Sequence, residues 1–408
     1  MLGEGHEVRI AASEALAQDT MAGMVPRTDD WRSELDWVRA SGRDGFMLFE
    51  AVSEGFGALQ DDLRRDGFQV VGGSSFGDRL ENDRAFAQRL LTELGLQVAP
   101  THEFTRAAEA LAFIAADPGR YVLKVNGGGS YVGQLPDGSD LAALLELRPP
   151  SGDFILQDHL SGVETGVGAY FNGHRFLRPA CLDWEEKRFF PGGLGELTGE
   201  MGTVATFNGS DRLFERTLAP LEPLLREAGH VGWVNLNCMI NEAGVWPLEF
   251  TCRFGYPGYA VLSALQTGGW GDLLRRLADR DSTGFPAAPG YSLGIVLTTP
   301  PFPYSRQQVN EPVGLPILID PALGAEDRRH IYWGEVGTAA GRLVTSGLYG
   351  WTAVVTGTGF TIEEAREHAL RRARALTIPD VRYRLDIGER LVRGDLAELV
   401  RWGLINEC

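Results

Sequence analysis

The sequence predicts a multidomain α/β and α+β protein, and three observations carry this prediction. The chain has 408 residues, which is too many for one compact hydrophobic core. Strand and helix patterns alternate at its start, as in a doubly wound α/β domain, whereas near its end a strand leads into a capping box that opens a helix. The composition is 44% hydrophobic and 23% charged, as in ordinary globular proteins. We expect an α/β domain over residues 1–78, a central domain over residues 79–290 and a smaller α+β domain over residues 291–408.

Charge and composition argue against several classes of protein. The net charge of −17 does not suit a protein that holds nucleic acid, because neutralising phosphates needs a basic surface. The four cysteines form no C-x-x-C pair and no metal-finger spacing, so we expect neither a disulfide framework nor a structural zinc site. No apolar run is long enough for a bilayer and no secretion signal opens the chain. We therefore expect a cytoplasmic protein without membrane contact.

The beginning of the chain lacks one part of a doubly wound domain. Residues 5–10 look like the end of a helix that runs directly into a second strand. The first strand and its glycine-rich, phosphate-binding turn are missing or reduced to residues 1–4, so we expect either a truncated start or a lost phosphate site. The same unit continues with strands at residues 45–49 and 68–72 and a helix at residues 53–65.

The central region contains a lysine beside a glycine run. Alternation in the strand Tyr121–Val125 sets Lys124 on the face opposite Leu123. The following residues, 126–130, include three consecutive glycines, whose N–H groups are suited to closing over phosphates. The segment matches neither a Walker loop nor a G-x-G-x-x-G motif. A phosphate-holding device and an ordinary surface lysine therefore remain alternative interpretations.

Periodicity and turn residues predict the other central elements. These are a helix from Asp83 that Gly95 ends, a helix that Thr105 caps and that runs to Ala116, and strands at residues 154–157 and 165–171. The glycine-rich residues 189–202 are expected to form an ordered loop over a ligand site. His230 shows no metal-ligand spacing and is interpreted as a core or surface histidine rather than a catalytic base.

A hairpin of residues 231–240 and 245–250 gathers polar side chains. A three-residue loop with Gly244 in the left-handed conformation would place Asn237 opposite Glu249, and Asn235 opposite Thr251, on one face. Carboxylate and amide oxygens are ligands that Mg²⁺ prefers. A solvated sheet face is the alternative, and it is the commoner setting for such residues.

The order of these pieces resembles the phosphoribosylamine-glycine ligases of the ATP-grasp superfamily. The resemblance extends from about residue 45 to the C-terminus. It is carried by the Lys124 strand with its glycine run, Gly162-Val163-Glu164, Thr198-Gly199-Glu200-Met201-Gly202, Glu249-Phe250-Thr251-Cys252-Arg253-Phe254-Gly255, the strand Tyr291–Val296 and Asp386-Ile387-Gly388. The resemblance implies an ATP-grasp fold over residues 79–290, with a lid over about residues 107–172.

The resemblance also implies an activity and a set of site residues. The implied activity is that of an ATP-dependent ligase of purine biosynthesis, which joins an amino acid to an amine through an acyl phosphate. The implied metal is Mg²⁺ or Mn²⁺, and the implied state is a monomer or homodimer. For ATP the matching positions are Arg84, Lys124, Gly127, Gly128, Gln157, Asp158, Leu160 and Glu164. The positions that match substrate-binding residues are Asp183, Lys187, Arg188, Thr198, Gly199, Glu200, Met201, Gly202 and Arg253. The metal position is Glu249, with Asn237 and Thr251. The catalytic positions are Lys124, Glu249 and Arg253.

Several positions depart from the family pattern. Thr251 stands in place of an Asn, Glu200 in place of a Gly, and Gly255-Tyr256-Pro257-Gly258 in place of Gly-Asp-Pro-Glu. Residues 183–188 match a charged family segment near the substrate phosphate, but a solvated run of charges is an alternative. Two rival hypotheses follow. One is an ATP-grasp ligase for a different amino acid or amine, and the other is a catalytically inactive nucleotide-binding protein.

Overall fold

The chain folds into two compact units. The computed structural model describes residues 1–12, 19–50, 55–125, 130–304 and 313–406. The first unit comprises Met1–Ala87, Glu164–Asn237 and Glu249–Cys408, and the second comprises Gln88–Val163 and Cys238–Leu248. The domain boundaries expected from the sequence stay a prediction. Among the described residues, no helix has the length and apolar character that crossing a membrane requires.

The first unit begins with two pairs of short parallel strands. β1 (Ile10–Ala11) pairs with β2 (Arg27–Thr28), and β3 (Phe46–Leu48) pairs with β4 (Gln69–Val71). Parallel neighbours need crossover connections, and α2 (Phe56–Arg65) lies in the connection between β3 and β4. α1 (Leu35–Ala40) lies between β2 and β3 in the chain. The third helix, α3 (Ser75–Asn82), follows β4. The predicted strands at 45–49 and 68–72 are confirmed, and so is the described part of the helix at 53–65.

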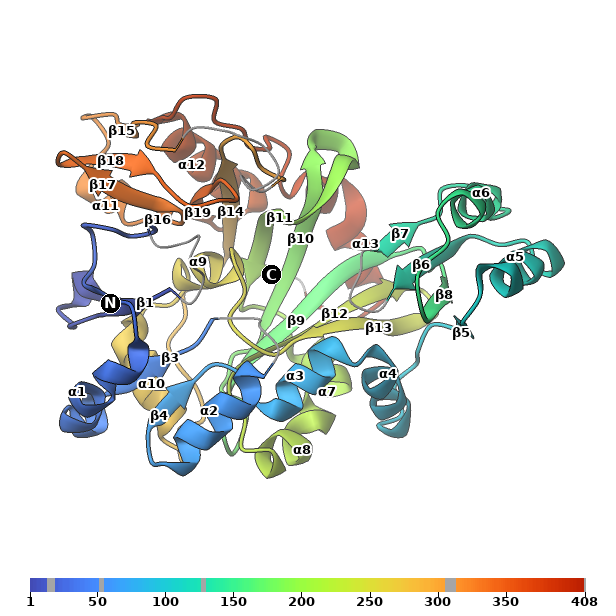
Figure 1. The fold of residues 1–408 in the computed structure, drawn as a ribbon, viewed down its shortest axis with the longest axis horizontal. Helices are drawn as coiled ribbons and strands as arrows, with labels where there is room; N and C mark the ends of the chain where they lie inside the picture. Colours follow the sequence, from blue (N-terminus) through green and yellow to red (C-terminus); the bar gives the residue numbers. More distant parts are fainter. Residues whose placement is uncertain (13–18, 51–54, 126–129, 305–312, 407–408) are drawn as a thin grey trace. The chain divides into compact units, whose positions relative to one another are not determined.

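An eight-stranded sheet is the main feature of the chain, with the order β13-β12-β9-β10-β11-β14-β19-β16 (Figure 1). Its strands are β9 (Val163–Asn172), β10 (Cys181–Phe190), β11 (Leu194–Thr206), β12 (Val231–Asn241), β13 (Gly244–Thr251), β14 (Tyr291–Thr298), β16 (Ile331–Trp333) and β19 (Trp351–Gly359). β10, β11, β14 and β19 pair antiparallel in succession. Three strands from residues 291–408 therefore belong to the same sheet as the central strands.

Helices and small sheets complete the first unit. α12 (Ile362–Arg374) packs on β14 and β19, and α9 (Gly258–Ser263) packs on β11 and β14. The predicted capping box at Thr361 is confirmed, because its side chain and that of Glu364 each accept from the other's backbone N–H. The remaining elements are α7 (Asp211–Thr217), α8 (Glu222–Glu227), α10 (Gly269–Ala278), α11 (Ala325–Arg328), α13 (Leu396–Arg401), β15 (Leu318–Ile319), β17 (Val336–Ala339), β18 (Arg342–Thr345) and β20 (Leu376–Thr377).

The second unit contains a four-stranded sheet in the order β5-β8-β6-β7. Its elements are β5 (Thr101–Phe104), β6 (Tyr121–Val125), β7 (Ser130–Val132), β8 (Phe154–Asp158), α5 (Ala107–Ala116) and α6 (Ser139–Leu147), with α4 (Arg84–Glu93) entering from the first unit. Tyr121 and Leu123 are buried while Lys124 is half-buried, so the predicted orientation of Lys124 is confirmed. Thr105 was predicted as a helix cap, which is wrong, because α5 begins one residue later with Arg106 at its N-cap.

The glycine-rich residues 189–202 form paired strands, so the loop predicted there is wrong. β10 and β11 pair antiparallel across this stretch, with only the short turn Pro191–Gly193 between them. A Cβ on Gly202 would lie 2.6 Å from the carbonyl oxygen of Gly294 and 2.7 Å from the Ile387 side chain. Glycine is therefore required here for close packing of the sheet rather than for an irregular loop.

The predicted hairpin is confirmed, but its turn differs from the expectation. β12 ends at Asn241 and β13 begins at Gly244, so two residues connect the strands instead of three. Gly244 has the expected positive φ, at 143°, but it is the first residue of β13 rather than part of a three-residue loop. Within this turn, Asn241 Oδ1 accepts from the N–H of Ala243 at 3.0 Å.

Arg384 joins β10 to the C-terminal segment. It is 1% exposed, and its guanidinium donates to both carboxylate oxygens of Asp386 at 2.8 Å. It also lies 3.2 Å from a carboxylate oxygen of Glu186 and donates to the carbonyl oxygen of Arg188 at 2.9 Å. All of its polar neighbours are therefore acceptors, as a buried guanidinium requires.

We expect Arg384→Met to lower the free energy of unfolding by about 3 kcal/mol, because two carboxylates and a carbonyl lose their buried donor. Urea denaturation of both proteins measures the difference. Arg393→Met is the matched control, because that arginine is 75% exposed and pairs with Glu389 on the surface. Its loss should cost at most about 1 kcal/mol. Equal effects of the two substitutions would contradict the prediction.

His230 lies in the core beside the start of α3. Its Nδ1 is 2.9 Å from the hydroxyl oxygen of Ser74, which accepts from the N–H of Gly77 at 3.0 Å and so caps the helix. Burial, with the nearby charge of Arg64, lowers the pKa of His230 from 6.5 to about 3. His230 is therefore neutral in the folded protein at neutral pH, and it must remain so for the protein to stay folded.

Lowering the pH should destabilise the protein through His230. The unfolded histidine gains a proton near pH 6.5 and the folded one only near pH 3, so the free energy of unfolding decreases as the pH falls through that window. The loss is about 1.4 kcal/mol per pH unit. Between pH 7 and pH 5, the free energy of unfolding measured with urea should fall by roughly 2 kcal/mol more in the wild type than in His230→Asn. An identical pH dependence would exclude His230 as the source.

Candidate active site

Three carboxylates surround the ammonium group of Lys187. Its Nζ lies 3.0 Å from Glu164 Oε1, 3.1 Å from Glu185 Oε2 and 3.1 Å from Glu249 Oε1. The four residues come from β9, β10 and β13. Burial by itself would lower the pKa of Lys187, but the charges of Glu185, Glu164 and Glu249 outweigh it and hold the pKa well above its usual value. Lys187 is therefore a permanent positive charge that links three strands.

Strand alternation explains how these side chains converge. Asp183, Glu185 and Lys187 follow each other at intervals of two along β10 and so share one face. Asn235 Nδ2 donates to Asp183 Oδ2 at 2.6 Å, and Asn237 Nδ2 donates to Glu185 Oε2 at 3.2 Å. The polar face of the predicted hairpin therefore meets the acidic face of β10.

Two glycines on β9 make this meeting possible, because β9 lies between β10 and β12. A Cβ on Gly166 would lie 2.1 Å from Asp183 Oδ1, and a Cβ on Gly168 would lie 2.1 Å from the Trp233 ring. Any larger residue would collide with these side chains. The side chains of Asp183 and Trp233 therefore lie over β9, where the strand presents no side chain of its own.

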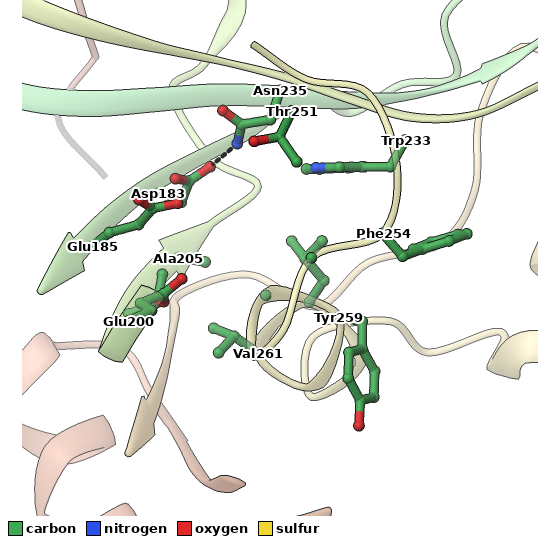
Figure 2. A pocket seen from close by; sticks show the side chains of 14 residues that line it. Asp183, Glu185, Glu200, Ala205, Trp233, Asn235, Thr251, Phe254, Tyr259 and Val261 are labelled. Atoms are coloured by element: carbon green, nitrogen blue, oxygen red, sulfur yellow. Dashed lines mark hydrogen bonds between the residues drawn. The ribbon is translucent and has the colours of Figure 1, made fainter. Parts of the chain in front are cut away.

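A small cavity of about 50 Å³ lies beside this acidic face (Figure 2). It is lined by Asp183, Glu185, Glu200, Thr203, Ala205, Trp233, Asn235, Thr251, Phe254, Gly255, Gly258, Tyr259, Val261 and Leu262. Asp183 Oδ1, Glu200 Oε1 and Thr203 Oγ1 are buried and have no hydrogen-bond partner. The cavity has room for several water molecules, each of which needs roughly 10–15 Å³.

The buried acids of the cavity favour their neutral forms. Burial, with the charge of Glu185, raises the pKa of Asp183 above its usual value despite the hydrogen bond from Asn235. Burial, with the charges of Glu185 and Asp183, raises the pKa of Glu200 well above its usual value. Lys187 opposes both shifts without reversing them. These carboxyls would therefore become more acidic if a positive charge entered the cavity.

The other predicted substrate residues fall in different places. Met201 is fully buried among Phe189 and Phe302, while Glu200 lines the cavity. The Thr198 hydroxyl donates to the carbonyl oxygen of Lys187 at 2.7 Å, which fixes β11 against β10. Arg188 faces away from the Lys187 side of β10 and donates to the carbonyl oxygen of Gly195.

The predicted nucleotide and catalytic residues are spread over both units. In the first unit, Arg84 begins α4 and Arg253 Nη2 pairs with Glu81 Oε1 at 2.9 Å. In the second unit, Lys124 lies on β6, and Gln157 Nε2 donates to the Thr101 hydroxyl at 3.3 Å. The remaining members are Asp158 at the end of β8, Leu160 just beyond it, and Gly127 and Gly128, which lie outside the described residues. Their roles stay predictions.

The sequence contained a signal for residues that were not singled out. Glu185, Thr203 and Trp233 line the cavity, yet Glu185 stood in a segment for which a solvated run of charges was the alternative interpretation. Asp183, Glu185 and Lys187 alternate with Trp184 and with residues of the other face, which is the pattern of a strand with one functional face. Applying this period to residues 183–188 would have found Glu185.

A divalent cation has one half-exposed carboxylate available here. Among the residues that the structure describes, no three His, Cys, Asp or Glu side chains are placed to share a metal ion. Mg²⁺ usually takes one or two carboxylates and completes its shell with phosphates and water. Glu249, whose side chain is 51% exposed, with the oxygens of Asn237 and Thr251 nearby on β12 and β13, fits that requirement. Lys187 would compete with the ion for Glu249.

Replacing Lys187 tests this competition. In Lys187→Met, Glu164, Glu185 and Glu249 lose their shared cation, so we expect Mn²⁺ to bind the nucleotide-free protein about tenfold more tightly than the wild type. Electron paramagnetic resonance of free Mn²⁺ measures the affinity. Arg188→Met, on the opposite face of β10, is the matched control and should leave Mn²⁺ binding unchanged. Unaltered binding in both variants would rule out the competition.

Curated phosphoribosylamine-glycine ligases match the chain over most of its length, although no protein-family model matches it. The protein from Streptomyces coelicolor is 27% identical over 344 residues, which cover 81% of this chain and 80% of that protein. The protein from Nostoc sp. is 27% identical over 358 residues, which cover 82% and 81% of the two chains. The similarity is therefore modest in identity and broad in extent.

Solved structures share the fold. Phosphoribosylamine-glycine ligase from Thermotoga maritima aligns with a TM-score of 0.71 at 22% identity, covering 94% of this chain and 95% of that chain. Biotin carboxylase from Campylobacter jejuni aligns with a TM-score of 0.61 at 12% identity, covering 98% and 94%. The predicted mixed fold of the ATP-grasp type is thereby confirmed. By sequence and by fold, the chain is a divergent relative of the phosphoribosylamine-glycine ligases within the ATP-grasp superfamily.

Proposed function

We propose that the protein is an ATP-dependent ligase that joins a carboxylate to an amine. The carboxylate attacks the γ-phosphorus of ATP to form an acyl phosphate and ADP, and the amine then displaces phosphate to form an amide. Relatives that span four-fifths of the chain carry the name of such a ligase. The observation that carries the proposal is the arrangement of ionised and amide side chains from β9, β10, β12 and β13 around Lys187.

The nucleotide needs positive charge, because negative charge is spread over the transferring phosphoryl group. Lys124 and Arg84 are proposed to contact the phosphates of ATP. Glu249, with Asn237 and Thr251, would hold Mg²⁺ or Mn²⁺, which would neutralise charge on the nucleotide when bound. A protein of similar fold, the biotin carboxylase domain of a 2-oxoglutarate carboxylase, was solved with MgADP. Lys187, whose Nζ lies 3.1 Å from Glu249 Oε1, is proposed to hold this side chain in place until then.

The amine must lose a proton when it attacks the acyl phosphate. A carboxylate whose pKa is raised by burial is a better proton acceptor than an exposed one. Asp183 has such a pKa, and its Oδ1 lines the cavity without a hydrogen-bond partner. The charge of an entering ammonium favours the ionised form of Asp183, and we propose that this carboxylate then accepts the proton of the amine.

Lysine usage supports the assignment of Lys124 and Lys187. The 38 Lys and Arg residues of the chain include only two lysines, and these are Lys124 and Lys187. Arginine serves at every other cationic position. A compact ammonium differs from a planar guanidinium in size, hydration and hydrogen-bond geometry, so the two are not interchangeable at a crowded site. Both lysines stand where the family resemblance implies contact with ATP or with substrate.

Lys124→Met should reduce the rate of ADP release by at least about a hundredfold, because a charge that stabilises the phosphoryl transition state is lost. A coupled assay of ADP with separate kcat and KM for ATP measures the effect. Lys124→Arg is the matched control, and it should recover part of the rate because it keeps the charge. Near-normal ATP turnover in Lys124→Met would remove Lys124 from the mechanism.

A ligase for a different amine is the second candidate function, and Glu200 favours it. The family resemblance places a glycine there, whereas this chain has a buried carboxyl in the cavity. Incubation with ATP, glycine and phosphoribosylamine separates the candidates. Glycine-dependent ADP release without the sugar-phosphate amide would favour a different amine. Nucleotide binding without ADP release for any acid and amine would instead favour an inactive nucleotide-binding protein.

A further inference from the structure

We propose that the cavity beside Asp183, Glu185 and Glu200 binds a small, unphosphorylated organic cation, namely a primary ammonium on a short apolar stem. Its role as the amine that receives the acyl group rests on the ligase function proposed above. The binding itself rests on the cavity alone. A phosphorylated amine, which the family resemblance would suggest, is excluded from this position by the charges described next.

The polar wall of the cavity consists of acceptors that need a positive partner. Asp183 is 7% exposed and Glu200 is 8% exposed, and each has a buried oxygen without a hydrogen-bond donor. An unpaired buried carboxyl oxygen is costly, and an ammonium group carries up to three N–H donors that can satisfy such oxygens. The Thr203 hydroxyl, which also lacks a partner, lines the same wall.

Among the described residues, the lining contains no cationic side chain that would hold a phosphate. None of the fourteen residues around the cavity is Lys, Arg or His. The ammonium of Lys187 is already in contact with Glu164, Glu185 and Glu249. The guanidinium of Arg253, whose Nη1 lies 3.7 Å from the position of a Cβ on the lining residue Gly255, is paired with Glu81 at 2.9 Å. A phosphate group would therefore face carboxyl groups without a counter-charge, which is unfavourable in a buried site.

The opposite wall is aromatic and aliphatic, which suits an organic cation better than a metal ion. Trp233, Phe254 and Tyr259 line this side, and the Trp233 ring extends toward the acidic side chains (Figure 2). Aromatic faces attract ammonium groups and also cover an apolar stem. The Trp233 ring is held by the Tyr170 ring at 4.8 Å between centroids. The carboxylates are not placed to share one metal ion, and the volume of about 50 Å³ limits the ligand to a few heavy atoms.

Glu200 is the residue that we propose to set this specificity. It lies on β11, next to β10, and lines the same side of the cavity as Asp183 and Glu185. The family resemblance places a glycine at this position, which would leave space and no charge. Glu200 fills that space and adds a second buried carboxyl oxygen without a partner. One substitution therefore both narrows the cavity and reverses its preference from a bulky anionic amine to a small cationic one.

Calorimetric titration of the full chain with ethylammonium tests the binding. We expect ethylammonium to bind the wild type, and Glu200→Gln to weaken that binding at least about tenfold, because the substitution keeps the shape and removes a carboxyl that can ionise beside the ammonium. O-phosphoethanolamine, a phosphorylated amine of similar stem, should not bind at this site. Glu196→Gln is the matched control: Glu196 is an exposed carboxylate on the same strand that does not line the cavity, and binding should be unchanged.

Asp183→Asn provides a second test if Glu200→Gln does not fold, with the same loss expected. Binding of O-phosphoethanolamine as tight as that of ethylammonium would overturn the proposal. So would ethylammonium binding that neither substitution weakens, or displacement of ethylammonium by Mg²⁺ alone.

Parallel assays of ADP release separate this inference from the proposed function. If the protein releases ADP with glycine but does not bind ethylammonium, the ligase function stands and the cation site is refuted. If ethylammonium binds with the expected loss in Glu200→Gln but no acid and amine provoke ADP release, the cation site is supported and the ligase function fails.

Discussion

The ion contacts of Lys187 are the interaction on which the site depends. Glu164 and Glu185 come from the consecutive strands β9 and β10, and Glu249 comes from the distant strand β13; without the ammonium at their centre they would repel one another. Because Lys187 is largely withdrawn from water, its three partners also compensate the cost of burying it. The result is a face of the sheet on which acidic, amide and ammonium groups hold fixed positions before any ligand arrives, as a preorganised site requires.

Local patterns sufficed to predict much of the fold, whereas the contacts between distant strands were beyond them. The strand that carries Lys124, the helix that Thr361 caps and the hairpin at residues 231–250 each follow from periods and turn residues within a short window. The pairing of residues 189–202 does not, because its glycines look like a loop until Gly294 is known to lie against them. The family resemblance, rather than periodicity, suggested Lys187 as a site residue.

In the candidate site too, local patterns predicted some of the residues but not the contacts between distant strands. Asn237 and Glu249 were expected on one polar face, and each now has a partner from β9 or β10. Neither partner could be deduced from the sequence, because the sheet order β12-β9-β10 decides which side chains lie close together. A glycine in β9 then leaves the space that these side chains need to come into contact. The fold is therefore similar to that of phosphoribosylamine-glycine ligase from Thermotoga maritima, whereas a buried Glu200 stands where the family resemblance places a glycine. Related ligases share a fold for handling the nucleotide, and a few strand positions are enough to alter what is joined.

The scarcity of lysine has a practical consequence for spectroscopy. Lys124 and Lys187 lie in different compact units, and each is the sole lysine of its unit. Reductive methylation with ¹³C-formaldehyde would therefore place one lysine probe in each unit, with the α-amino group as a distinguishable third. Chemical shifts of these methyl groups depend on the charge around the nitrogen. The two probes could thus follow events in the two units independently, in a single spectrum and without mutagenesis.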